Sequence, residues 1–192
     1  MKKLLLSVAL LSGFTLTNAQ TNWTVDKAHT TIGFNVTHLV ISEVEGEFKE
    51  FDAKVTSTSD DFAGSEVSFT AKVASIDTDN EQRDNHLKSE DFFNAEKNPE
   101  LKFSGKIQKD GDKYKLVGKL TMRETTKDVT FDVKYNGTIK DPWGNIKSGF
   151  KITGTVNRKE YGLKWGALTE AGGAVVADEV SIVCNVELQK QS

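Results

Sequence analysis

Apolar residues occupy every second position through most of this chain, and that alternation limits the possible folds more than any other feature. From Val129 to Tyr135, for example, apolar residues alternate with threonine, aspartate and lysine. A period of two places one row of side chains on each face of a β-strand, so these segments predict half-buried strands. Turn sequences such as Asp110-Gly111 separate the segments and predict hairpin connections.

The pattern predicts an all-β fold, with about eight strands and a single helical interruption. We expect an antiparallel β-barrel, and a two-sheet β-sandwich is the alternative. The alternation stops between Ser75 and Phe93, where Asp79 and Asn80 are suitable caps for a short helix. This segment is predicted to cover one end of the barrel as a lid.

The first residues have the features of a secretory signal peptide. Lys2 and Lys3 precede an apolar run from Leu4 to Leu16, and Ala19 is a small residue before a plausible cleavage site. The apolar run is too short to span a membrane. We therefore expect removal of residues 1–19, a single domain over residues 20–192, and a periplasmic or secreted protein with no membrane span.

The net charge argues against nucleic acid as a partner, and the cysteine content excludes stabilisation by an internal disulfide. Removal of Lys2 and Lys3 leaves 25 − 2 = 23 basic residues against 28 acidic residues, a formal net charge of −5. An acidic exported chain is not suited to nucleic acid. Cys184 is the only cysteine, so no internal disulfide forms and packing must supply the stability.

Glycines occur in the apolar phase of four different strands, at Gly46, Gly105, Gly118 and Gly154. Such glycines either mark bulges and bends or leave room inside a barrel for a small ligand. The aromatic residues beside them favour an apolar tunnel. The other residues of the predicted tunnel wall are Phe34, Val36, Phe48, Phe69, Phe103, Leu116, Leu120, Phe131, Phe150, Ile152 and Ile182.

Catalytic chemistry has little support in the sequence. His29, His38 and His86 are not spaced as a compact metal-ligand motif, so hydrogen-bonded structural histidines are the default and no metal site is predicted. The chain has no Gly-x-Ser-x-Gly nucleophile elbow, and no catalytic residue is predicted. Two alternatives remain open: a secreted metal-assisted hydrolase, and a stress-related interaction module with a filled barrel.

Basic residues near the predicted strand ends are candidates for contact with a polar head group. A guanidinium group suits phosphate, carboxylate or carbonyl oxygens, but the same side chains can pair with nearby aspartates and hold loops in place. The residues predicted for head-group contact or the lid are His29, His38, Arg83, His86, Leu87, Phe92, Phe93, Arg123, Lys127 and Arg158.

Several segments, spread over the chain after residue 22, carry a family resemblance. In order they are Trp23-x-Val25-Asp26-x-x-His29, Phe34-x-Val36-x-His38-Leu39, Gly46-x-Phe48, Ser75-Ile76-Asp77-Thr78, Arg83-Asp84-x-His86-Leu87-Lys88-Ser89-x-Asp91-Phe92-Phe93, Leu120-Thr121-x-Arg123-x-x-Thr126-Lys127 and Asn157-Arg158-x-x-Tyr161-Gly162. Together they resemble the YceI-like family.

The resemblance implies a lipocalin-like barrel that binds a long-chain isoprenoid or similar amphiphile, often as a homodimer and with no established enzymatic activity. Isoprenoid quinones, polyprenyl phosphates, fatty acids and amides are the implied ligand classes, and no cofactor other than a bound lipid is expected. The chain departs from the family pattern at Thr30, where serine is usual, and at Glu124, where glycine is common. A carboxylate beside Arg123 disfavours a pyrophosphate head more than a neutral quinone, a fatty acid or an amide.

Overall fold

The computed structural model describes residues 20–170 and 172–191 of the 192-residue chain, and the predicted signal peptide lies outside them. Its strands are β1 (Thr21–Val25), β2 (Thr31–His38), β3 (Ser42–Phe48), β4 (Phe51–Ser57), β5 (Glu66–Lys72), β6 (Ile76–Asp77), β7 (Glu100–Asp110), β8 (Lys113–Met122), β9 (Thr125–Lys140), β10 (Ile146–Asn157) and β11 (Val176–Lys190). Its helices are α1 (Glu81–Lys88) and the 3-10 helices η1 (Lys27–His29), η2 (Val73–Ser75) and η3 (Arg158–Tyr161). Within these two ranges, no helix is both long and apolar enough to cross a membrane.

Eight strands close into a barrel. Hydrogen bonding follows the order β1-β4-β5-β7-β8-β9-β10-β11, and β1 also pairs with β11, with Trp23 opposite Lys190. Neighbouring strands are antiparallel throughout this ring. The predicted antiparallel barrel is therefore confirmed. The β-sandwich alternative is wrong because all the strands of residues 20–170 and 172–191 belong to one sheet, which the pairing of β1 with β11 closes.

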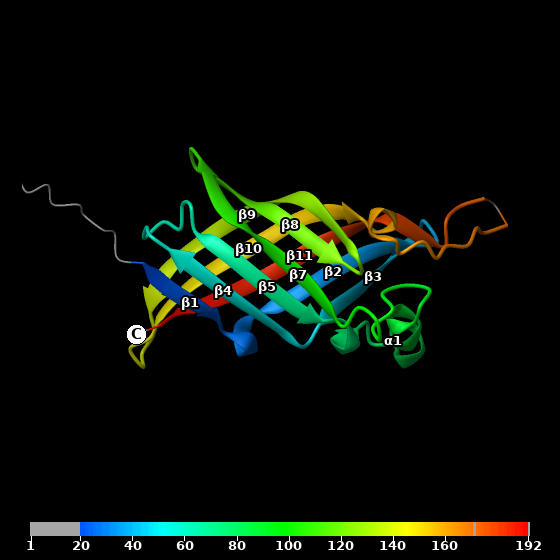
Figure 1. The fold of residues 1–192 in the computed structure, drawn as a ribbon, viewed down its shortest axis with the longest axis horizontal. Coiled ribbons are helices and arrows are strands. Elements are labelled where there is room, and N and C mark those ends of the chain that lie inside the picture. The colour runs from blue at the N-terminus through cyan, green and yellow to red at the C-terminus, as the bar shows by residue number, and fades with distance from the viewer. Residues whose placement is uncertain (1–19, 171, 192) are drawn as a thin grey trace, which may run out of the picture.

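Three further strands lengthen the barrel wall at one end. After η1 the chain continues from β1 into β2, which pairs with the first part of β11 and with β3. The short strand β6 then pairs with β3, with Ile76 opposite Phe48. Figure 1 shows the resulting elongated barrel, with α1 at one end of the long axis.

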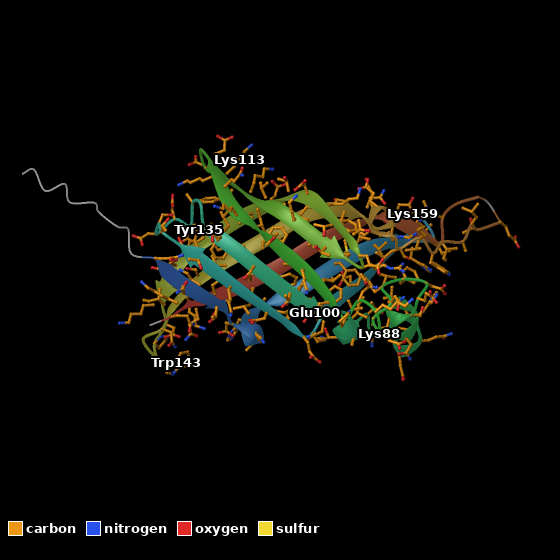
Figure 2. All side chains as sticks on the ribbon, viewed as in Figure 1. Lys88, Glu100, Lys113, Tyr135, Trp143 and Lys159 are labelled. Carbon is orange, nitrogen blue, oxygen red and sulfur yellow. The ribbon has the colours of Figure 1, made fainter. Side chains whose placement is uncertain are left out.

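An aromatic plug closes the end of the barrel opposite α1. Phe62 lies in the connection between β4 and β5 and is 1% exposed. Its ring centroid lies 5.0 Å from those of Trp23 and Phe150, and 5.6 Å from that of Tyr135. Tyr135 marks this end in Figure 2. Burial of these large rings stabilises the end and seals the interior from solvent.

Polar contacts hold the lid helix α1 in place. The Asn80 side chain accepts a hydrogen bond of 3.0 Å from the Arg83 N–H, so the predicted cap at this residue is confirmed. Asp84 is buried and accepts from the Thr78 N–H at 2.9 Å. An eight-residue helix is marginal by itself, so these contacts are what fixes the helix at the barrel end.

Candidate functional site

An apolar cavity of about 230 Å³ runs inside the barrel. Side chains of all eight strands in the closed ring line it, together with residues of β2, β3 and α1. Along β11 the lining extends from Val176 to Leu188, which is roughly 40 Å of chain at about 3.3 Å per residue. The cavity is therefore narrow, long and apolar.

The predicted tunnel wall can be compared with this lining residue by residue. Every predicted wall residue other than glycine lines the cavity: Phe34, Val36, Phe48, Phe69, Phe103, Leu116, Leu120, Phe131, Phe150, Ile152 and Ile182. Three further residues of the same alternating rows also line it: Met122, Val180 and Val186. The period of two in the sequence is the signal that identifies them. Thr30 also lines the cavity, and no sequence pattern indicated it.

The four glycines do not belong to the wall, contrary to the prediction, because aromatic rings occupy the space above them. A Cβ atom on Gly105 or on Gly118 would lie 2.7 Å from Cζ of Phe103, and closer still to a backbone carbonyl oxygen of the neighbouring strand. A Cβ atom on Gly154 would lie 2.5 Å from Cδ1 of Phe131. The Phe34 ring covers Gly46 in the same way. These glycines are therefore not open notches: all four let phenylalanine rings lie close to the barrel wall, and the facing pair Gly105 and Gly118 also lets β7 and β8 approach each other closely.

We expect Gly154→Ala to lower the free energy of unfolding by about 1–3 kcal/mol, because the new methyl group must displace the Phe131 ring. Gly149→Ala on the same strand is the matched control, since the nearest atom to its Cβ is Cβ of Asn136 at 3.6 Å, an ordinary contact. Urea unfolding of both variants measures the difference. Equal stabilities would show that the ring does not depend on the glycine.

The apolar lid residues complete the cavity at the α1 end. Leu87, Phe92 and Phe93 line the cavity, as the lid hypothesis requires. The His86 ring packs edge-on against Phe92 at 5.0 Å and against Trp165 at 5.2 Å between centroids. The lid thus contacts the connection between β10 and β11, where the sequence did not single out Trp165.

Arg158 is a buried anchor for that connection. It is 5% exposed, and its Nε donates to the carbonyl oxygen of Ala177 at 2.8 Å. Its Nη1 donates to the carbonyl oxygens of Leu163 and Trp165 at 2.7 and 2.6 Å. Burial lowers the pKa of Arg158, but an arginine stays charged under any physiological condition. The geometry therefore favours the loop-anchoring role over head-group contact.

The other predicted basic residues also hold the chain together, but unlike Arg158 they do not line the cavity. Arg123 Nη1 donates to the carbonyl oxygen of Gly162 at 2.7 Å, and Arg83 Nε donates to Thr78 Oγ1 at 2.7 Å. Lys127 Nζ pairs with Glu160 at 3.1 Å. The predicted lid or head-group residues that do not line the cavity are His29, His38, Arg83, His86, Arg123 and Lys127.

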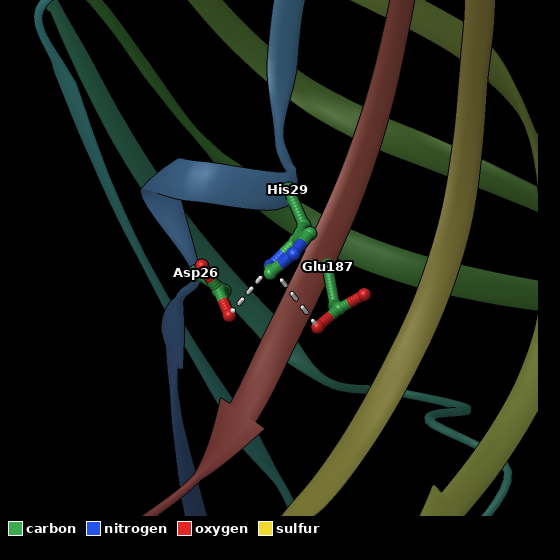
Figure 3. A group of neighbouring side chains, drawn as sticks. All are labelled: Asp26, His29 and Glu187. Carbon is green, nitrogen blue, oxygen red and sulfur yellow. Dashed lines mark hydrogen bonds and ion pairs between the residues drawn. The ribbon is translucent and has the colours of Figure 1, made fainter. Parts of the chain in front are cut away.

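His29 lies in a charged cluster that is not part of the cavity lining (Figure 3). Its Nδ1 lies 3.1 Å from Asp26 Oδ2 and 3.9 Å from Glu187 Oε1. These three residues have the donor types of a metal site, but the Lys147 ammonium pairs with both carboxylates, and lies 3.3 Å from Glu187 Oε1. The lysine offsets one of the two negative charges and occupies a position between the carboxylates that a metal ion would need, so the cluster gives the metal-assisted hydrolase hypothesis no support.

The ion pair between Asp26 and Lys147 makes the free energy of unfolding depend on pH in the acid range. The hydrogen bond from Lys147 is the main reason that the pKa of Asp26 falls from 3.8 to about 2. A lowered pKa stabilises the fold above about pH 4, and this contribution is lost as the pH falls from about 4 to about 2. We expect Asp26→Asn to cost about 1–2 kcal/mol at pH 7 and clearly less as the pH approaches 2. Urea unfolding at pH 7, 4 and 2.5 tests this, and a cost independent of pH would contradict it.

Comparison with known proteins supports the family that the sequence motifs resemble. The family model described as the YceI-like domain matches residues 23–188 of the chain. The chain belongs to the YceI-like family. A UPF0312 protein of Staphylococcus aureus (strain USA300) is 38% identical over 168 residues, which cover 87% of this YceI-like chain and 96% of that protein.

Solved structures of YceI proteins share the fold of this chain. The YceI protein of Campylobacter jejuni is 34% identical, with a TM-score of 0.70, and the match covers 88% of this chain and 98% of that one. A polyisoprenoid-binding domain from Saccharophagus degradans, implicated in plant cell wall breakdown, has a TM-score of 0.63 over the same shares. At 10% identity this last likeness concerns the fold alone.

Proposed function

We propose that this YceI-like protein binds the chain of one long isoprenoid or similar amphiphilic lipid inside the barrel and carries it without chemical change. The observation that supports the proposal most is the long apolar cavity, plugged by Phe62 at one end and covered by Leu87, Phe92 and Phe93 at the other. The fold shared with a polyisoprenoid-binding domain agrees with this ligand class.

The wall of the cavity suits a passive carrier. Apart from Thr30 and Arg158, its polar atoms are few, and burial raises the pKa of the Cys184 thiol to about 11. That thiol stays neutral at physiological pH and behaves as a small apolar side chain, because the thiolate is the reactive form. Binding without catalysis is thus the function that these side chains favour over hydrolysis.

A neutral or weakly polar head group fits the lid end better than pyrophosphate. The guanidinium groups of Arg123 and Arg158 already donate to backbone carbonyl oxygens. Glu124 and Arg123 both border a polar groove between the segment after α1 and η3, so a carboxylate shares that groove with the arginine. We therefore place quinones, fatty acids and amides ahead of polyprenyl phosphates.

The proposal also includes export of the protein and its assembly into a homodimer. Cleavage after Ala19 would deliver the mature domain to the periplasm or the medium, where a lipid that dissolves poorly in water needs a carrier. A homodimer stays a prediction from the family resemblance.

Affinity should depend on the length of the ligand chain. Each methylene moved from water into an apolar site contributes about 0.8 kcal/mol, so the dissociation constant should fall about fourfold for each added methylene until the chain fills the cavity. Titration of delipidated protein with a series of fatty acids and matching amides measures this slope and the effect of the head. A dissociation constant independent of chain length would refute binding in the cavity.

A further inference from the structure

Four large apolar side chains are exposed together at the α1 end of the barrel. Leu39, Val40 and Ile41 form the turn between β2 and β3 and are 38%, 67% and 86% exposed. Leu168, in the connection between β10 and β11, is 75% exposed. We call these four residues the apolar tip. Figure 1 shows that connection, in orange, projecting past the barrel.

The backbone holds the apolar tip in a fixed and costly shape. Leu39 and Val40 have φ angles of 52° and 67°, a region that a β-branched residue rarely adopts. The Leu39 N–H donates to the carbonyl oxygen of Val175 at 2.9 Å, and Leu168 forms a β-bridge with Ala174. The hydrogen bond joins the two loops, and the bridge orders the connection between β10 and β11. Strain of this kind persists where surrounding structure enforces it, and it is concentrated at functional sites.

The apolar tip adjoins the cavity. His38, the residue before Leu39, pairs with Val176 across the strands, and both Val176 and Val36 line the cavity. The other end of the barrel is sealed by Phe62. A ligand that enters or leaves past the lid therefore passes beside the apolar tip.

We propose that the apolar tip inserts shallowly into a lipid bilayer, so that the α1 end of the cavity faces the membrane that supplies or receives the ligand. The choice of a membrane rests on the proposed function, because a ligand of this class is stored in bilayers. A second copy of the chain fits the tip less well. Four side chains bury a few hundred Å² at most, whereas a stable interface needs about 800 Å² per partner.

Charge selects the kind of membrane. The mature chain has a formal net charge of 23 − 28 = −5, and Glu43 and Glu170 flank the two loops of the apolar tip. Anionic lipids would repel such a surface, and only basic clusters gain from them. The bilayer that suits the apolar tip is zwitterionic or neutral, and the contact should be insensitive to salt because apolar burial drives it.

Flotation with phosphatidylcholine vesicles tests the proposal. We expect the mature protein to float with the vesicles, and Ile41→Asp with Leu168→Asp to reduce the bound fraction at least about tenfold. Ile139→Asp with Trp143→Asp is the matched control. These residues are 68% and 85% exposed, and Trp143 lies at the opposite end of the barrel (Figure 2), so this variant should float as the wild type does.

Fatty-acid binding in vesicle-free solution, measured on the same three proteins, distinguishes membrane docking from ligand binding in the cavity. All three should bind equally there. A wild type that binds fatty acid but does not float, or a control that loses flotation as the tip variant does, overturns membrane docking alone. A tip variant that only converts a dimer into a monomer overturns it in favour of self-association.

Discussion

Replacing Ile182 by tryptophan should weaken ligand binding by at least about a hundredfold while the barrel stays folded. Ile182 lines the cavity from the middle of β11, where its partners across the sheet are Phe34 and Gly154. An indole there would fill space that the ligand chain needs. A hundredfold loss is about 2.7 kcal/mol, which equals the burial of only three or four methylenes.

Val183→Trp is the control for that experiment, since Val183 is the next residue along β11 and is not among the lining residues. Its side chain lies on the other face of the strand, so the added ring should leave the affinity unchanged. Titration of both variants with the same fatty acid gives the comparison. If Val183→Trp lost as much affinity as Ile182→Trp, or if neither lost any, the ligand would bind elsewhere.

Arg158→Met should lower the free energy of unfolding by about 3 kcal/mol or more. The substitution leaves the carbonyl oxygens of Leu163, Trp165 and Ala177 without their donor, and an unpaired buried polar group costs about 1–3 kcal/mol. Arg158→Lys should recover little of this, because one ammonium group cannot reproduce the fork of a guanidinium. Urea unfolding measures both variants.

Lys159→Met provides the comparison for Arg158→Met. Lys159 is the next residue and pairs with Asp178 at 2.9 Å, the same carboxylate that Arg158 contacts at 3.4 Å. Its side chain is 47% exposed, and an exposed pair contributes at most about 1 kcal/mol. A small and equal effect of both substitutions would mean that the buried hydrogen bonds of Arg158 do not hold the connection.

The barrel and most of its apolar wall were accessible from the sequence because both depend on a local pattern. The period of two identifies which face of each strand is buried, so Phe69 and Ile152 were placed on the inner face without knowledge of their neighbours. The short helix followed from an equally local signal, the capping residue Asn80.

The roles of the glycines, of Phe62 and of Arg158 could not be predicted from the sequence, because they depend on contacts between distant segments. The ring above Gly154 belongs to Phe131 on the neighbouring strand, so the glycine pattern was visible but its meaning was not. Phe62 lies in a connection outside every alternating row, and only its aromatic neighbours reveal it as the plug. Arg158 binds backbone carbonyl oxygens, which every residue has, so no side-chain pattern indicates its role.

Native mass spectrometry of the mature protein, purified without detergent from cells that export it, tests whether the barrel holds a lipid. We expect a species heavier than the polypeptide by the mass of one amphiphilic lipid, which organic extraction releases and which Ile182→Trp lacks. A protein that shows only the mass of the bare chain, and that takes up no lipid when incubated with a total membrane extract, would contradict the account.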